Sequence, residues 1–400
     1  MHTVEQAQAL VRQSILPVGS ETIALANSLG RVLSESPRAR IANPPNNVSA
    51  MDGYAVRAVD VPELPGSLTI VGESAAGHSY DGELGACQAV RIFTGAQVPI
   101  GADTIVIQED TDRTGQILTI KEIKPGRHIR LKGQDFSEGD DLLFSPVRLS
   151  SRHIGLLAAA NHPSLQVHRK PRVAILSTGD EIVLPGEPRG PDQIVSSNGP
   201  ALSAFVESRG GIPVHMGVAK DEQAALTTMA IAAKDCDLVL TSGGVSVGDK
   251  DLVRAAFSEA GLKVAFHKIA MRPGKPLLFG HLDETPVLGL PGNPVSTMVC
   301  AYLFAGIALD CLQGLPGNPP EPIAAILSED INKNGSRQDY MRAVLSRNAD
   351  GSFSTAPISK QDSSMIGAFA RSAALIVRPI GAGPAKKGEV VPVLPLDSLL

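Results

Sequence analysis

The sequence predicts a multi-domain α/β plus β protein built around a central open α/β sheet. Short apolar strands alternate with helical segments between residues 173 and 312, whereas β-type runs without helices fill residues 68–143 and the region after residue 322. The chain has 400 residues, 43% of them hydrophobic and 19% charged, which is too long for one ordinary core and too apolar for disorder. We therefore expect several compact domains.

The N-terminal part is predicted to begin with helices. Glu5–Leu16 places apolar residues at helical spacing and ends at Pro17, Ala24–Gly30 is typical of a second short helix, and helical spacing returns at Ser151–Ala160. The Pro-rich stretch SPRARIANPPNNVSAMDGYAV is predicted to be a loop and a domain junction. The N-terminus lacks the pattern of a signal peptide, and we expect no apolar run of membrane-spanning length.

The central block is predicted to be an open parallel sheet. Its strands are VAILST, IPVHMGV, DLVLTS, LKVAFHKI, PLLFG and PVLGL, and its helices are Ala201–Ser208, Asp221–Ala233, Lys250–Ala260 and Pro294–Leu312. Such sheets present ligand groups at the carboxyl ends of their strands. The runs IAAILS, MRAVLS, ALIVRPI and EVVPVL predict a small β domain at the C-terminal end.

Charge and cysteine content exclude several classes of protein. The net charge is −5, from 36 basic and 41 acidic residues, so no broad cationic field points to nucleic acid or an anionic membrane as a partner. A small ligand is the better expectation. The four cysteines (Cys87, Cys236, Cys300 and Cys311) lack zinc-site spacing or disulfide density, which predicts reduced, mostly buried thiols and a cytoplasmic location.

The sharpest local motif is DLVLTSGGVSVGDKD, a strand followed by a glycine loop. Its loop residues Ser242, Gly243, Gly244 and Ser246 are candidates for binding a phosphate, because glycines let backbone N–H groups approach without a Cβ in the way. Asp249 is a candidate N-cap of the next helix. The alternative is an ordinary turn that needs glycine only for its dihedral angles.

Acidic and hydroxyl side chains follow three strands of the block. The candidates are Ser177, Thr178, Gly179, Asp180, Glu181, Asp221 and Asp251. If these strands are neighbours, their carboxylates converge on one crevice, where Glu181, Asp221 and Asp251 could hold Mg²⁺ beside a phosphate or oxyanion. Each acid alone is more often a solvated helix or turn cap.

A basic turn, HKIAMRPGKPLLFG, places Lys268, Arg272 and Lys275 within eight residues around a Pro-Gly pair. Such a rigid turn suits anions such as phosphate, although a surface hairpin with incidental charge is the alternative. In GLPGNPVS, Pro291 and Pro294 fix the backbone ahead of a helix, which favours a role in shaping pocket walls.

Two loops lie outside the central block. Asp52 precedes a strand in NNVSAMDGYAV, and Thr94 lies in a turn of AVRIFTGAQVPIGADTIVIQED. The residues of these two loops by themselves predict ordinary turns and indicate no further function.

Taken together, PPNNVSAMDGYAV, RIFTGAQVPIGADTIV, STGDEI, TSGGVSVGDKD, MRPGKP and GLPGNPVS resemble the signature of the MoeA and gephyrin E-domain family. The resemblance implies a molybdopterin-binding type of central domain at 169–317, an inserted β domain at 44–136, a split N-terminal domain at 1–43 and 137–168, and a C-terminal β-barrel-like domain at 318–400. It also implies a homodimer.

The resemblance implies a reaction as well, the transfer of molybdenum from molybdate to adenylylated molybdopterin with Mg²⁺-dependent release of AMP. The implied catalytic positions are Asp52, Thr94, Asp135, Glu181, Asp221 and Asp251. The implied anion-binding positions are Lys268, Arg272, Lys275, Arg342 and Ser363. Arg272, often lysine in the family, and Gln134, often acidic, depart from the pattern.

Two other functions compete with this reading. Adenylyl transfer from ATP to molybdopterin would use the same glycine loop and acids, but the N-terminal β module and the β tail argue against it. A receptor scaffold, as in animal gephyrin, would not need the acidic residues. A molybdopterin adenylyltransferase and other proteins of cofactor biosynthesis are the expected partners besides a second copy of the chain.

Overall fold

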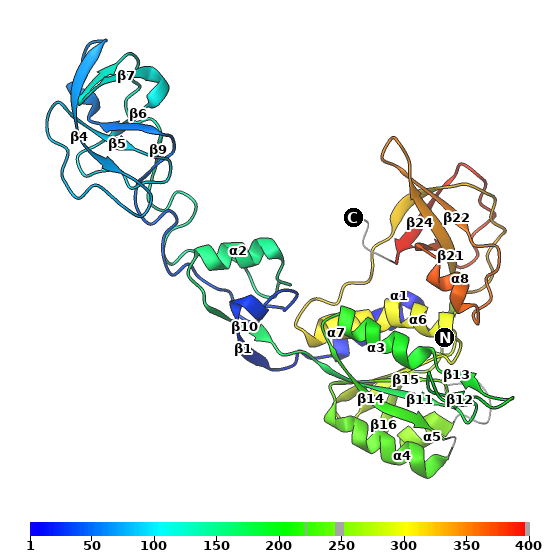
Figure 1. Ribbon diagram of the computed structural model, residues 1–400. Coiled ribbons are helices and arrows are strands. Elements are labelled where there is room, and N and C mark those ends of the chain that lie inside the picture. The colour runs from blue at the N-terminus through cyan, green and yellow to red at the C-terminus, as the bar shows by residue number, and fades with distance from the viewer. Residues whose placement is uncertain (221, 245–251, 397–400) are drawn as a thin grey trace. The chain divides into compact units, whose positions relative to one another are not determined.

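The computed structural model describes residues 1–220, 222–244 and 252–396. The chain forms two compact units (Figure 1), of which unit 1 comprises Met1–Glu21 with Val167–Leu400 and unit 2 comprises Thr22–Gln166. Each unit has its own hydrophobic clusters.

Unit 1 is built on a six-stranded sheet with the strand order β14-β11-β15-β19-β18-β16. The strands are β11 (Arg172–Thr178), β14 (Ile212–Ala219), β15 (Leu238–Ser242), β16 (Leu262–Phe266), β18 (Leu278–Leu282) and β19 (Thr285–Leu290). The first four in the order are parallel, as predicted, but β18 is antiparallel to both of its neighbours. The prediction of an all-parallel sheet is therefore wrong, because two residues join β18 to β19 and so short a turn can only reverse the strand direction.

Helices cover both faces of this sheet. They are α1 (Val4–Ser14), α3 (Asn198–Ser208), α4 (Gln223–Ala232), α5 (Leu252–Glu259), α6 (Pro294–Cys300), the π-helical turn η5 (Ala301–Ala305), α7 (Gly306–Leu312) and the 3-10 turn η4 (Ala233–Asp235). Along β11, Val173 and Ile175 join a cluster with residues of α1, α3, α6 and α7, whereas Ala174 and Leu176 join one with residues of α4 and α5. Alternate residues of a strand point to opposite faces, so the predicted apolar run becomes a strand buried on both sides.

The helical segment Pro294–Leu312 is long and apolar enough, by length and composition, to cross a membrane. The expectation that no run reaches this length is therefore wrong. The segment is 83% buried inside the protein, however, and its side chains belong to the main cluster of unit 1. The core helix of a soluble protein passes the same test, so this helix is weak evidence of a membrane span.

The C-terminal strands of unit 1 close into a barrel. They are β20 (Ile323–Leu327), β21 (Gln338–Arg347), β22 (Phe353–Pro357), β23 (Ala374–Arg378) and β24 (Val390–Pro395), with the short helix α8 (Ile366–Ala370). The order β21-β22-β20-β24-β23 is closed by pairing of β21 with β23, which confirms the predicted barrel-like domain. The two-residue strand β17 (Met271–Arg272) adds to β21 in parallel. The small pair β12 (Ile182–Val183) and β13 (Ile194–Val195) lies apart from the barrel.

Unit 2 contains the predicted β module. Its six-stranded sheet has the order β6-β3-β5-β4-β8-β7, from β3 (Gly53–Val56), β4 (Gly66–Ser74), β5 (Gln88–Ile92), β6 (Thr104–Ile107), β7 (Thr111–Thr114) and β8 (Ile117–Ile120). A second pair joins β2 (Val48–Ser49) to β9 (Ile129–Arg130), and two 3-10 turns are η2 (Ala58–Asp60) and η3 (Gln108–Asp110). Buried residues on the two sheet faces form two clusters.

The segments flanking this module run side by side in opposite directions. Isolated bridges join Val32 to Arg148, Arg38 to Asp141 and Asn43 to Phe136. The predicted helix at the end of the second segment is α2 (Ser151–Ala159). The predicted helix Ala24–Gly30 is wrong, because β1 (Ser20–Ala24) and the 3-10 turn η1 (Leu25–Asn27) replace it.

The reason lies in the next residues. The backbone N–H and hydroxyl of Ser28 both donate to the carbonyl of Leu25, and Gly30 has a φ of +74°. This geometry ends a 3-10 turn rather than continuing an α-helix. The remaining strand, β10 (Ser164–His168), pairs with β1 in a two-stranded sheet.

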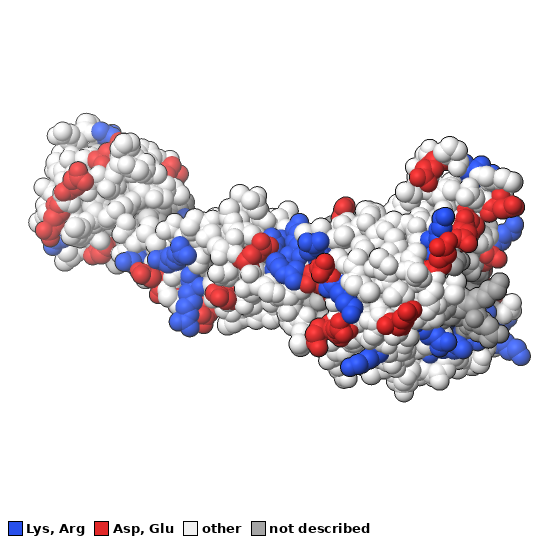
Figure 2. All heavy atoms as spheres, turned by 90° about the horizontal axis from the view of Figure 1, so that it is seen from below, with Lys and Arg blue, Asp and Glu red and all other residues white. Residues whose placement is uncertain are grey.

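Charges of both signs are interspersed on the face of the protein shown in Figure 2, in which no broad field of Lys and Arg is present. The cysteines agree largely with prediction, because Cys236, Cys300 and Cys311 are buried and only Cys87 is exposed. Burial raises the pKa of the Cys311 thiol to about 11, so this thiol stays protonated.

Candidate functional site

A cavity of about 600 Å³ lies in unit 1 at the carboxyl ends of β11, β15 and β19. These strands are parallel neighbours, so the loops that follow them meet at one edge of the sheet. The cavity is lined by Ser177, Thr178, Gly179, Glu181, Ile182, Ile194, Val195, Ser196, Ser197, Asn198, Ser242, Gly243, Gly244, Pro276, Pro291, Gly292, Asn293, Pro294, Ser296 and Ser364. It therefore brings together most of the motifs that the sequence singled out in the central block.

The glycine loop requires its glycines for both conformation and space. Gly243 and Gly244 have φ angles of +93° and +66°, which L side chains rarely adopt. A Cβ on Gly243 would lie 2.8 Å from the carbonyl oxygen of Thr178, and one on Gly244 would lie 2.0 Å from Val253 Cγ2. The loop backbone is therefore packed against the end of β11, where a ligand can approach it. Ser246 and Asp249 lie outside the described residues.

Polar side chains on the cavity wall are only partly satisfied. Asn198 Nδ2 donates to Ser242 Oγ at 2.7 Å and to the carbonyl of Gly292 at 2.8 Å. The buried atoms Asn198 Oδ1 and Thr178 Oγ1 have no hydrogen-bond partner among the residues that the structure describes. Buried polar atoms are nearly always hydrogen-bonded, so these two oxygens are places where a polar ligand could bind.

Two of the predicted acidic residues, Asp180 and Glu181, lie in the described part of the chain. Glu181 is exposed at the cavity, and its carboxylate lies 2.7 Å from where a Cβ on Gly179 would be. Asp180 is exposed beside it. The order β14-β11-β15 makes the three acid-bearing strand ends neighbours, as the prediction assumed, but Asp221 and Asp251 lie outside the described residues.

The cavity presents a small set of possible metal donors. Within residues 1–220, 222–244 and 252–396, no group of three or more His, Cys, Asp or Glu residues could hold a metal ion. The carboxylate of Glu181 and the hydroxyls of Ser177 and Thr178 are nonetheless the hard oxygen donors that Mg²⁺ prefers, and Mg²⁺ keeps several waters. The described donors therefore fit Mg²⁺ with one protein carboxylate.

The C-terminal barrel contributes a loop to this cavity. Asn293 Nδ2 donates to Ser363 Oγ at 2.9 Å, and Val295 N donates to the carbonyl of Ser363 at 3.1 Å. Ser364 lines the cavity directly. Pro291 and Pro294 also line it, which agrees with their predicted role in shaping its walls. Ser363 thus contacts a lining residue without being one.

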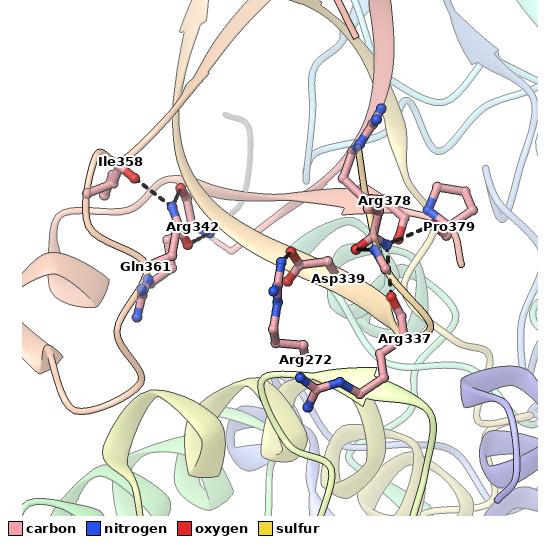
Figure 3. Close-up of polar contacts among 10 residues, drawn as sticks. Arg272, Arg337, Asp339, Arg342, Ile358, Gln361, Arg378 and Pro379 are labelled. Atoms are coloured by element: carbon pink, nitrogen blue, oxygen red, sulfur yellow. Dashed lines mark hydrogen bonds and ion pairs between the residues drawn. The ribbon is translucent and has the colours of Figure 1, made fainter. Parts of the chain in front are cut away.

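The basic turn is anchored to the barrel rather than open on all sides. Arg272 donates to Asp339, which is only 5% exposed (Figure 3), and β17 pairs with β21 at these two residues. The Asp339 carboxylate raises the pKa of Arg272. Lys268 and Lys275 are exposed, and Pro276, next in the chain, lines the cavity. Arg272 therefore has a partner, and of the two lysines only Lys275 is adjacent in the chain to a lining residue.

Arg342 is placed differently from a surface anion-binding residue. Its side chain is only 2% exposed, and it donates to the carbonyls of Asp362 at 2.7 Å and Lys360 at 3.1 Å. Burial lowers the pKa of this guanidinium. Arg342 does not line the cavity, but it holds the backbone of the loop that carries Ser363.

In unit 2 the structure brings Asp52 and Thr94 together. Thr94 donates to Asp52 Oδ1 from its backbone N–H at 2.7 Å and from its hydroxyl at 2.9 Å. These hydrogen bonds, the backbone one first, lower the pKa of Asp52, which is exposed. Asp135 lies elsewhere in unit 2, where its carboxylate accepts from Asn43 Nδ2 at 3.1 Å.

Several residues that line the cavity were not predicted from the sequence, above all Ser196, Ser197 and Asn198. They stand between β13 and the body of α3, in the run IVSSNGP. A cluster of Ser and Asn at the start of a helix is a recognisable N-terminal signal, and here it follows a strand. A Ser and Asn cluster at a helix start directly after a strand is the sequence signal that could have identified these three residues.

Comparisons with known proteins agree with this geometry. Family models for the MoeA N-terminal region (domain I and II), a probable molybdopterin binding domain and the MoeA C-terminal region (domain IV) match residues 2–161, 174–310 and 324–396. A molybdopterin molybdenumtransferase from Nostoc sp. is 38% identical over 94% of this chain and 89% of that protein. One from Haemophilus influenzae is 34% identical over the whole of both chains.

Solved structures extend the likeness to the whole fold. Two crystal structures of a molybdopterin biosynthesis moeA protein from Pyrococcus horikoshii superpose with TM-scores of 0.86 and 0.84, at 31% and 26% identity. Both alignments cover 99% of this chain, and they cover 99% and 100% of the solved chains. The chain belongs to the MoeA family of molybdopterin molybdenumtransferases.

Proposed function

We propose that the chain transfers molybdenum from molybdate to adenylylated molybdopterin and releases AMP. The observation that carries this proposal is the cavity of about 600 Å³, which combines a close-packed glycine loop with buried oxygens left without partners. A pterin edge presents alternating donors and acceptors, which suit Thr178 and Asn198. The backbone of Gly243 and Gly244 suits a phosphate.

Cleavage of the phosphoanhydride needs positioning and neutralisation of charge more than a covalent intermediate. No protein nucleophile is required. We assign Glu181 to the phosphate side of the cavity, and Asp52, Thr94 and Asp135 to the same reaction from unit 2. We assign Asp221 and Asp251 to the same side of the cavity as Glu181, because the strands that precede these three residues are neighbours in the sheet.

The negative charge of Glu181 explains why phosphate binding in this cavity would need Mg²⁺. It is the one charged side chain among the described residues that line the cavity. A carboxylate facing phosphate would repel it unless a divalent cation lay between them. Bound Mg²⁺ would neutralise the phosphate charge as the anhydride bond breaks. Lys268, Lys275 and Arg272 would hold molybdate or phosphate oxygens next to this site, Arg272 while paired with Asp339.

We further propose that the chain works as a homodimer in the cytoplasm, receiving its substrate from an adenylyltransferase. Asp52 and Thr94 would then serve the α/β domain of the partner. The free state of all four cysteines suits a reducing compartment.

The test is AMP release from adenylylated molybdopterin by the purified chain, with molybdate and Mg²⁺. Asp52→Asn and Glu181→Gln remove charge at constant shape and should lower turnover by about 100-fold or more. The matched control is Glu187→Gln, because Glu187 caps the neighbouring turn through Leu184 N at 2.7 Å and does not line the cavity.

Molybdate-dependent AMP release by the wild type and the control, with loss in the two variants, is the expected result. If the wild type is inert but forms adenylate from ATP and molybdopterin, the chain performs the preceding step. If both variants keep wild-type turnover, the two carboxylates have no role in the reaction.

A further inference from the structure

Arg91, on β5 of unit 2, contacts the neighbours of both Asp52 and Thr94. Its Nη1 donates to the carbonyl of Gly53 at 3.1 Å, and its Nη2 donates to Gln108 Oε1 at 2.9 Å. Gln108 N in turn donates to the carbonyl of Asp52 at 3.1 Å. The guanidinium therefore holds the backbone that directly follows the Asp52 Cα, at the Gly53 carbonyl itself and at the Asp52 carbonyl through Gln108.

The same guanidinium lies over two aromatic rings. Its Cζ is 5.1 Å from the centroid of Tyr54, the residue directly opposite it in the β3–β5 pairing. It is 4.8 Å from the centroid of Phe93, which precedes Thr94. Alternate residues share a sheet face, so Arg91 and Phe93 project together, and a planar cation between two rings is strongly oriented. Arg91 is thus fixed against the residues adjoining Asp52 and Thr94.

We propose that Arg91 is a positioning residue, which holds the Asp52 carboxylate and the Thr94 hydroxyl and N–H in hydrogen-bonded register for the reaction. This rests on the proposed function for the importance of Asp52 and Thr94. Arg91 acts through them and needs no contact with substrate. The local tightness of β3 supports it, since a Cβ on Gly53 would lie 2.0 Å from the Val106 carbonyl oxygen and the strand has little freedom to shift.

Two substitutions in the full-length protein separate positioning from charge. Arg91→Met removes the charge, both hydrogen bonds and the stacking, whereas Arg91→Lys keeps a cation but cannot donate in two directions from between two rings. The control is Arg113→Met, on the exposed hairpin strand β7 of the same sheet, where Arg113 Nε donates to the nearby Gly115 carbonyl at 2.9 Å.

The first readout is an NMR titration of the Asp52 carboxyl together with the amide shift of Thr94. If Arg91 positions the pair, both Arg91 variants raise the pKa of Asp52 and move the Thr94 amide upfield, because the hydrogen bonds that lower this pKa weaken. Unchanged values in Arg91→Lys overturn the proposal, since a purely electrostatic role predicts a change only in Arg91→Met. If Arg91→Met fails to fold, Arg91→Lys alone decides between these outcomes.

The second readout is turnover. We expect kcat to fall by about 10- to 100-fold in both Arg91 variants with little change in KM for molybdate, because misplacement of a reacting group slows the chemical step. Wild-type kcat in both variants overturns the proposal. Failure of the proposed function can be told apart from failure of the Arg91 proposal. If the proposed function is wrong, Asp52→Asn retains full turnover, but the NMR titration of Asp52 in the Arg91 variants still shows whether Arg91 positions it.

Discussion

The Asp52–Thr94 contact makes a pH prediction at the scale of single residues. Both hydrogen bonds favour ionised Asp52, so its pKa lies below the ordinary 3.8. The stabilisation of the ionised form is present above pH 3.8 and is lost as the pH falls through the lowered pKa. Thr94→Val removes the hydroxyl bond but keeps the stronger backbone bond, so the pKa of Asp52 should rise while staying below 3.8.

A carboxyl-specific NMR titration measures this change. Thr69→Val, the same substitution at an exposed position of β4 in the same sheet, should leave the titration of Asp52 as in the wild type. A pKa that returns fully to 3.8 in Thr94→Val would show that the hydroxyl also maintains the backbone bond. No change at all would show that the hydroxyl contributes nothing, contrary to our expectation.

At the scale of elements, the two-residue strand β17 links the basic turn to the C-terminal barrel. The side chain of Arg272 is 56% exposed, whereas the side chain of its partner Asp339 is 7% exposed. Removing one member of a buried pair leaves the other unsatisfied, although exposure of Arg272 to solvent reduces the loss. We predict that Asp339→Asn lowers the free energy of unfolding by about 1–2 kcal/mol and raises KM for molybdate as the turn loosens.

Urea unfolding and steady-state kinetics measure the two effects. The control is Asp330→Asn, which breaks the Lys386–Asp330 pair on the same barrel, where both side chains are more than half exposed. Such exposed pairs contribute about 0–1 kcal/mol. If Asp339→Asn loses no more stability than Asp330→Asn and its KM is unchanged, the pair does not hold the turn.

The same elements show how far local sequence patterns reach. The apolar run of β11 and the glycines after β15 determine a buried strand and a tight loop, and both were predictable because strand burial and loop conformation are local properties. The pairing of β17 with β21 was not predictable, because it joins residues 67 positions apart through two residues each. Nothing within either segment encodes that partner.

Side-chain environment was the other limit. The sequence treats Arg342 as a cation available to an anion, since arginine is usually exposed. It is buried on the face of β21 opposite to Met341 and Ala343, which join the barrel cluster, and its two Nη atoms donate to the carbonyls of Lys360 and Asp362. Asn198, in contrast, lines the cavity but was not predicted to do so, because its polar neighbours Ser196 and Ser197 are typical of any helix start.

At the scale of the whole molecule, the proposed residues lie in two units, and the proposed homodimer explains how both could serve one reaction. Asp52 is in unit 2 and Glu181 is in unit 1. If unit 2 of one copy completes the cavity of the other, a dimer of one Asp52→Asn chain and one Glu181→Gln chain retains one intact site of two. Random pairing of co-expressed chains makes half of the dimers mixed, so we expect about a quarter of wild-type turnover.

If each chain used only its own residues, every site in the mixture would carry a defect and turnover would stay at the level of the single variants. The control pairs Asp52→Asn with a chain that carries both substitutions, which leaves no intact site under either arrangement. Light scattering on the same samples reports the oligomeric state, and a monomer at assay concentration would exclude sharing. Recovery in the first mixture but not in the control assigns Asp52 to the partner's cavity, because only an exchanged unit 2 can combine an intact Asp52 with an intact Glu181.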